Sequence, residues 1–372
     1  LGLAYGVILG AFLHFIVQLP TFFILGFRLR PISSFKIHPG IFNNIKLSGP
    51  RVLAISFTSI SVLVVTAIAS TLSQGSIAVF QFANNLKFIP VGIFGVSFAV
   101  AAFPRLSQSF IRRDAEDFYS SFFGVLKTII FWLAPISVLF YVLRAHIVRL
   151  ALGTGLFNWG DTRLTAAVLG VFSFIIITES IMPLLIKSFY ALNNTLKPLV
   201  IGLIANVITV FFVFWLVDIF SDSSSGFVGF FGRLLRVGDF SDLSIVGIAL
   251  AVVIGQFLNF FLLLNFVLKE ARSAFGFVPR NGFLREVRII ITAAIISGFV
   301  AYGVRVVFDS FVTLDTFLGV LIQGGGAGIA GLASYGLILY KFENKEIMDV
   351  VEVFKRRLLK PQILPQGIEL DK

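Results

Sequence analysis

The sequence predicts an all-α membrane protein, a polytopic transmembrane bundle of about nine spans. Hydrophobic residues make up 57% of the 372 residues and charged residues only 13%, and the mean hydropathy is +0.97. That composition is too apolar for a soluble globular domain of this length. The apolar residues also run unbroken for about 20 residues at a time, which crosses a bilayer as a helix and lacks the alternation of a membrane barrel.

The individual spans follow from the length that a bilayer core demands. We expect them near residues 3–25, 51–73, 78–104, 119–143, 164–190, 198–220, 244–268, 286–307 and 316–341. The sequence begins at Leu1 directly with an apolar run, without a charged leader or a cleavage site of small residues. We therefore expect a further N-terminal part of the protein to precede it.

The basic residues predict the orientation in the membrane. The net charge is +11, and loops assigned alternately to the two sides divide the charge unequally. One side carries 20 of the 30 Lys and Arg, in segments 26–51, 105–118, 191–197, 269–285 and the tail from 341. The other side carries five, namely Arg144, Arg149, Arg163, Arg233 and Arg236. By the positive-inside rule the C-terminus is cytoplasmic, and topology explains the basic excess without nucleic acid.

Metal and cofactor chemistry finds little support in the composition. The chain has no cysteine and three scattered histidines, which leaves no thiolate site and makes a histidine site unfavourable. We expect no cofactor and no metal.

Polar residues and helix breakers share the span that begins near residue 78. Asn84, Asn85 and Lys87 stand where lipid tolerates no polar group, so we predict that they line a substrate pathway. The residues predicted to act as bending points there are Pro90, Gly92 and Gly95.

Two other spans carry polar side chains. Ser56, Ser59 and Thr66 belong to a hydroxyl stripe on one helical face of the second span, which either lines the same pathway or forms a helix contact. Gln256 and Asn259, at i and i+3 in the seventh span, are expected to be an interhelical hydrogen-bonding pair.

Glu179 is the carboxylate that lies deepest in the predicted spans. A charge at mid-bilayer costs roughly 2.5–3.5 kcal/mol on the insertion scale, so Glu179 is a predicted pathway residue. Pro183 removes the hydrogen bond to its carbonyl, and we expect a kink and a hinge there. Lys87 lies at a similar depth, within about 8 Å counted along the helices. We predict that Lys87 and Glu179 form an ion pair that opens during function; the alternatives are a static pair or a Lys87 that snorkels outward.

Four motifs agree in order and spacing with a known family. The segments HFIVQLP at 14–20, ASTLSQGSIAVFQFANNL at 69–86, PVGIFGVSFAVAAFPRLS at 90–107 and FYALNNTLKPL at 189–199 resemble the lipid II flippases of the MurJ (MviN) type. The resemblance implies a transporter, not an enzyme, in the bacterial inner membrane. Its implied activity is to export undecaprenyl-linked peptidoglycan precursor for cell-wall synthesis by alternating access of two lobes.

The resemblance also implies a domain organisation and partners. Residues 1–25 would be the last span of an N-terminal lobe, 26–50 a cytoplasmic linker, 51–268 the six-helix C-terminal lobe, 269–341 the final helix pair and 342–372 a basic cytoplasmic tail. Its partners would be the lipid-linked precursor and membrane lipids, in a monomer together with the N-terminal lobe.

One departure from the family pattern keeps other functions open. Many relatives read YADRL where this chain reads FANNL, so Asn84 and Asn85 replace an acid and an arginine. This favours a membrane scaffold without transport activity, whereas Lys87 and Glu179 argue against that function. An exporter of another polyprenyl-linked oligosaccharide, or a drug antiporter of the same superfamily, is a further alternative.

Overall fold

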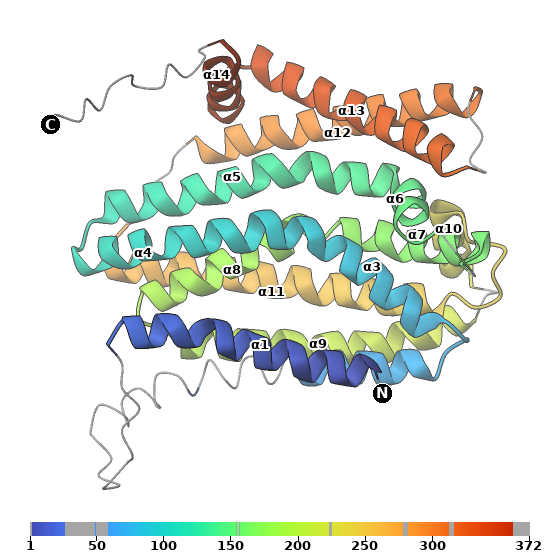
Figure 1. Cartoon of the computed structure of the whole chain (residues 1–372), viewed down its shortest axis with the longest axis horizontal. Helices are drawn as coiled ribbons and strands as arrows, with labels where there is room; N and C mark the ends of the chain where they lie inside the picture. The colour runs from blue at the N-terminus through green and yellow to red at the C-terminus, as the bar shows by residue number, and fades with distance from the viewer. Residues whose placement is uncertain are drawn as a thin grey trace, which may run out of the picture. The chain divides into compact units, whose positions relative to one another are not determined.

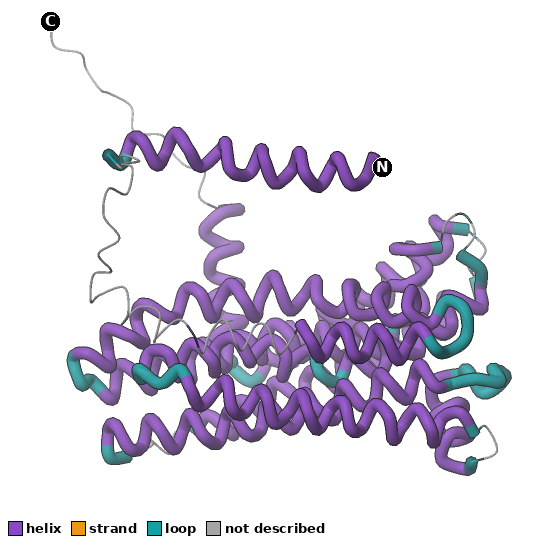
Figure 2. The backbone as a smooth tube through the Cα atoms, turned by 90° about the horizontal axis from the view of Figure 1, so that it is seen from below, coloured by secondary structure: helices purple, strands orange, loops and turns teal. Residues whose placement is uncertain are grey.

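The computed structural model describes most of the chain, and its regular elements there are all helices (Figure 2). The described residues are 2–26, 49, 59–153, 155, 157–222, 225–277, 282–311 and 316–359. The chain divides into two compact units, Leu1–Ser48 and Gly49–Lys372. The first unit contains the apolar helix α1 (Gly2–Ile24), in which Gln18 Nε2 and His14 Nε2 lie 2.8 Å apart in a hydrogen bond.

The second unit is a bundle of long helices that run side by side (Figure 1). Its first described helix is Ser59–Ser70. The elements that follow are α3 (Ser76–Pro90), η1 (Val91–Val96), α4 (Ser97–Ile111), α5 (Ala115–Val142), α6 (Arg144–Leu152), α7 (Trp159–Ser173), α8 (Ile176–Ala191), α9 (Leu196–Ser221), α10 (Gly226–Leu235), α11 (Ser244–Phe275), α12 (Phe283–Asp309), α13 (Phe317–Lys341) and α14 (Lys345–Leu359).

The predicted membrane bundle is confirmed. Among the described residues, seven helices are long and apolar enough to span a membrane, and α7 with α8 makes an eighth if the bent pair is one span. The expected second span, 51–73, is described only from Ser59 onward. The protein is therefore a multi-pass membrane protein.

The helix contacts place α5 and α8 in the centre of the second unit. Helix α8 packs on α4, α5 and α11, while α5 packs also on α12, and α12 on α13. The side chains of Ile129, Leu133, Leu184 and Phe189 are fully buried between these helices. Close packing of apolar side chains and internally bonded backbone are what a bilayer allows.

The last helix, α14, is held to the bundle by charges. Lys127 Nζ on α5 lies 2.5 Å from Glu286 Oε2 on α12 and 2.8 Å from Glu346 Oε1 on α14. Lys127, which lies within a span, thus has two carboxylate partners that offset its burial.

The strong bend in the predicted fifth span lies about two turns before Pro183. Helices α7 and α8 meet at 48° across the break at Phe174 and Ile175, and α8 continues through Pro183. The 48° bend therefore lies before Pro183, and a kink at Pro183 itself stays a prediction. Because α8 starts afresh at Ile176, Glu179 lies in its first turn, where the helix dipole favours a negative charge.

A π-helical segment interrupts the span from Ser76 to Ile111. Pro90 ends α3 and η1 follows at once, because proline supplies no N–H to the i→i−4 ladder. The two glycines of η1 differ in their surroundings. A Cβ on Gly95 would lie 2.6 Å from Ser180 Cα on α8, whereas the nearest atom to one on Gly92 is 3.9 Å away, on the Phe88 side chain. Gly95 is thus required for close approach of two helices.

Replacing Gly95 by alanine should destabilise the protein, because its Cβ would overlap backbone atoms of Ser180. Overpacking of this kind costs about 1–3 kcal/mol. We expect a lower melting temperature for Gly95→Ala in detergent, and little change for the matched variant Gly92→Ala. Equal melting temperatures for the two variants would contradict the close approach.

Candidate functional site

A cavity of about 430 Å³ opens inside the second unit, among helix Ser59–Ser70, α3, α8, α9 and α11. Its wall is largely apolar, from side chains such as Val65, Phe80 and Met182. Set into this wall is a group of polar side chains: Ser61, Gln81, Asn84, Lys87, Glu179, Asn206, Thr209, Gln256 and Asn259. A mostly apolar cavity with a few placed polar groups is the usual form of a ligand site.

The ion pair predicted between Lys87 and Glu179 is confirmed. Lys87 Nζ on α3 lies 2.7 Å from Glu179 Oε2 on α8. The lysine side chain is 2% exposed and the glutamate 17% exposed. Attraction between opposite charges holds this contact. The ring of Phe172 lies 4.7 Å from the same ammonium and adds a cation–π contact.

Local structure explains why both charges are tolerated. Burying one charge alone would leave a large desolvation cost, which an opposite charge at contact distance offsets. Glu179 also benefits from the positive end of α8, and Lys87 from the Phe172 ring.

The two asparagines before Lys87 point in different directions. Asn84 lies three residues before Lys87, so the two share a helix face, and both line the cavity. Asn85 is exposed and is not part of the lining. The structure therefore places Asn84 with the ion pair and leaves Asn85 on another face of α3.

The hydroxyl stripe of the second span contributes less than its pattern indicated. Ser59 and Thr66 do not belong to the cavity lining, and Ser56 lies outside the described residues. The helix Ser59–Ser70 instead presents Ser61, together with Val62 and Val65, to the cavity. Ser61 and Val65 are about one helical turn apart, and this spacing could have indicated which face of the helix lines the cavity.

Carboxamide side chains also line the cavity, and the pattern of charges in the sequence did not predict that they would. Gln81 comes from α3 and Asn206 from α9, and Gln256 and Asn259 come from α11. Asn259 Oδ1 is buried and has no hydrogen-bond partner among the described residues. Such groups can donate to and accept from the hydroxyls and amides of a polar ligand. In the described part of the chain, no three His, Asp or Glu side chains gather closely enough to hold a metal ion.

Comparison with known proteins gives one consistent family. A family model described as "Lipid II flippase MurJ" matches residues 1–322. Among curated proteins, the "Probable lipid II flippase MurJ" of Buchnera aphidicola subsp. Baizongia pistaciae is 25% identical over 297 residues, which is 80% of this chain and 52% of that protein. The protein of the same description from Haemophilus influenzae is 25% identical over 324 residues, 86% of this chain and 58% of the relative.

A solved structure has the same fold. The protein titled "Lipid II flippase MurJ, inward closed conformation" superposes with a TM-score of 0.59 at 22% identity, over 88% of this chain and 57% of the other. The chain thus spans between about half and two thirds of the length of the first three curated relatives that it matches.

Removing one member of the buried ion pair should destabilise the protein more than removing both. Lys87→Met leaves Glu179 buried without its partner, and such changes cost about 3–5 kcal/mol. The double variant Lys87→Met/Glu179→Leu should recover most of that loss. Thermal unfolding in detergent of the single and double variants measures the coupling.

The pair of Arg105 and Asp117 provides the control, since those side chains are 65% and 32% exposed. Exposed pairs contribute about 0–1 kcal/mol, so Arg105→Met should change the melting temperature little. A Lys87 variant no less stable than the Arg105 variant would contradict the assignment of a buried, coupled pair.

Proposed function

Because the chain belongs to the MurJ family of lipid II flippases, we propose that the protein exports lipid II, the undecaprenyl-linked peptidoglycan precursor, across the bacterial inner membrane. The family is one of transporters, and we propose that this protein carries out no covalent step. The cargo would be a lipid with a pyrophosphate and sugars at its head, delivered for cell-wall synthesis.

The observation that carries the proposal is the cavity with its buried ion pair. A pyrophosphate leaving water needs a charge-assisted partner, and Lys87 is the cation that lines the cavity. In the absence of cargo, Glu179 satisfies that cation at 2.7 Å. Cargo pyrophosphate would compete with Glu179 for Lys87, so that binding and opening of the ion pair are one step. The carboxamides around the pair would receive the sugar hydroxyls.

We propose in addition how the protein is oriented in the membrane and how it divides into lobes. The excess of Lys and Arg in one set of loops supports a cytoplasmic C-terminus. Residues 51–268 would form the C-terminal lobe and α12 with α13 the final pair, and residues 1–25 would belong to an N-terminal lobe. Alternating access would then move the two lobes against each other, with the protein acting as a monomer in contact with membrane lipids.

The irregular helices near the ion pair are suited to such movement. The π-helix Val91–Val96 follows Pro90 one turn after Lys87, and π-segments occur often at functional sites. We propose that Pro90 and Gly92 bend there, since Gly92 has space around it. Gly95 would keep η1 against α8, and Pro183 would permit bending near the middle of α8.

Complementation tests the role of the ion pair in transport. Expressed from its whole reading frame in a cell depleted of its own lipid II flippase, the protein should restore growth and outward transfer of lipid II. Lys87→Gln should lower that transfer about 10- to 100-fold, since a hydrogen bond to a charged group contributes about 1.5–3 kcal/mol. Glu179→Gln should also lower the transfer of lipid II, because a neutral glutamine cannot form the ion pair with Lys87 again after the cargo has left.

The matched control is Lys187→Gln on α8, a half-buried lysine whose ammonium lies 5.3 Å from the Phe103 ring and does not line the cavity. Membrane levels of every variant should be equal, so that loss of folding is not read as loss of transport. Full rescue by both Lys87→Gln and Glu179→Gln would end the proposed role of the pair. Failure of the unchanged protein to transfer lipid II would end the proposed function.

A further inference from the structure

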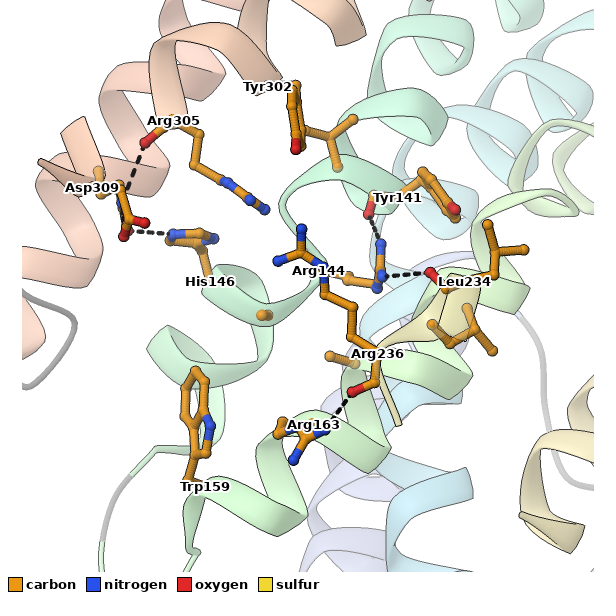
Figure 3. Close-up of a pocket in the computed structure, with 15 residues that line it drawn as sticks. Tyr141, Arg144, His146, Trp159, Arg163, Leu234, Arg236, Tyr302, Arg305 and Asp309 are labelled. Atoms are coloured by element: carbon orange, nitrogen blue, oxygen red, sulfur yellow. Dashed lines mark hydrogen bonds between the residues drawn. The ribbon is translucent and has the colours of Figure 1, made fainter. Parts of the chain in front are cut away.

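A second cavity, of about 350 Å³, lies where α6 and α7 meet the ends of α10, α12 and α13 (Figure 3). Four of its lining residues are arginines from four different segments: Arg144 on α6, Arg163 on α7, Arg236 directly after α10 and Arg305 on α12. We call it the arginine pocket. Asp309 is the carboxylate of its lining.

One of the four guanidinium groups is neutralised. Arg163 Nη1 donates to Asp239 Oδ2 at 2.7 Å and Nη2 donates to the other oxygen of the same carboxylate. This contact holds the pKa of Asp239 below its usual range. Asp309, the other acid, accepts a hydrogen bond from Gln323 Nε2 at 3.1 Å.

The remaining three arginines have no carboxylate partner within the described chain. Arg144 donates to the carbonyl oxygens of Tyr141 and Leu234. Arg305 lies 5.0 Å from the Tyr302 ring. Burial, and then the like charges of Arg236 and Arg305, lower the pKa of Arg144. Because all three arginines line one cavity, their like charges disfavour one another, which an anion between them would reverse.

The topology makes this gathering unexpected. Only five Lys and Arg lie in the loops assigned to the outer side, because basic residues are depleted there. Three of those five, Arg144, Arg163 and Arg236, converge on this one pocket. The positive-inside rule does not require basic residues on the outer side of the membrane. The convergence of Arg144, Arg163 and Arg236 there therefore indicates a ligand.

We propose that the arginine pocket binds the phosphate or pyrophosphate headgroup of a membrane lipid. Guanidinium groups match phosphate oxygens with paired donors, and the volume suits a headgroup. Trp159 and Tyr302 are each about half exposed at the pocket, as aromatic side chains are at membrane interfaces. Val306, the residue after Arg305 on α12, is exposed and offers an apolar side chain for the lipid chain. The assignment to cargo, as opposed to a resident phospholipid, rests on the proposed function.

Lipid binding to the purified protein, followed by native mass spectrometry, tests the proposal. The probes are undecaprenyl pyrophosphate, phosphatidylglycerol, inorganic pyrophosphate and, as the lipid without phosphate, diacylglycerol. The variant is Arg236→Gln/Arg305→Gln, because neither guanidinium has a hydrogen bond or an ion pair with another described residue. We expect affinity for both phosphate-bearing lipids to fall about 10-fold or more.

Arg233→Gln is the matched control, an exposed arginine of α10 outside the lining, and it should bind as the unchanged protein does. Unchanged lipid binding by the double variant would overturn the proposal, as would equal binding of diacylglycerol or binding of inorganic pyrophosphate alone. Tighter binding of undecaprenyl pyrophosphate than of phosphatidylglycerol assigns the site to cargo, and the reverse order assigns it to phospholipid. Because this assay measures no transport, its result is independent of the complementation test.

Discussion

The low dielectric of the membrane interior is the constraint that the second unit is built around, and the ion pair of Lys87 and Glu179 is where it is met most directly. Neither charge is tolerable alone at that depth, so α3 and α8 must bring them together. This requirement fixes the rotation of α3, which in turn places Asn84 in the cavity and Asn85 outside it. The same contact between α3 and α8 thus sets both the polar site and the packing of the two helices.

Three irregularities lie within about a turn of this pair. The π-helix starts one turn after Lys87, the 48° break between α7 and α8 ends just before Glu179, and Gly95 contacts Ser180, the neighbour of Glu179. A regular helix would satisfy its own backbone groups and offer nothing to a ligand. The departures from regularity are therefore concentrated where polar chemistry is required.

Other charged side chains of the second unit also need partners that offset their burial, and they find them in different ways. Lys127 is shared between Glu286 and Glu346 and so ties α14 to α5 and α12. In the arginine pocket, by contrast, Arg144, Arg236 and Arg305 form no ion pair with a carboxylate in the described part of the chain. The first arrangement is complete without a ligand, and the second gains stability from an anion.

The sequence by itself determined the membrane bundle, the span positions and the pairing of Lys87 with Glu179, because apolarity and depth are local properties that a helix of fixed rise preserves. It did not determine which face of each helix meets the cavity, so Ser61 was missed and Asn85 was included. Nor did it place the bend before Glu179 in preference to Pro183, or bring together arginines from α6, α7, α12 and the end of α10. Those features depend on contacts between helices far apart in the chain, and only the tertiary structure decides them.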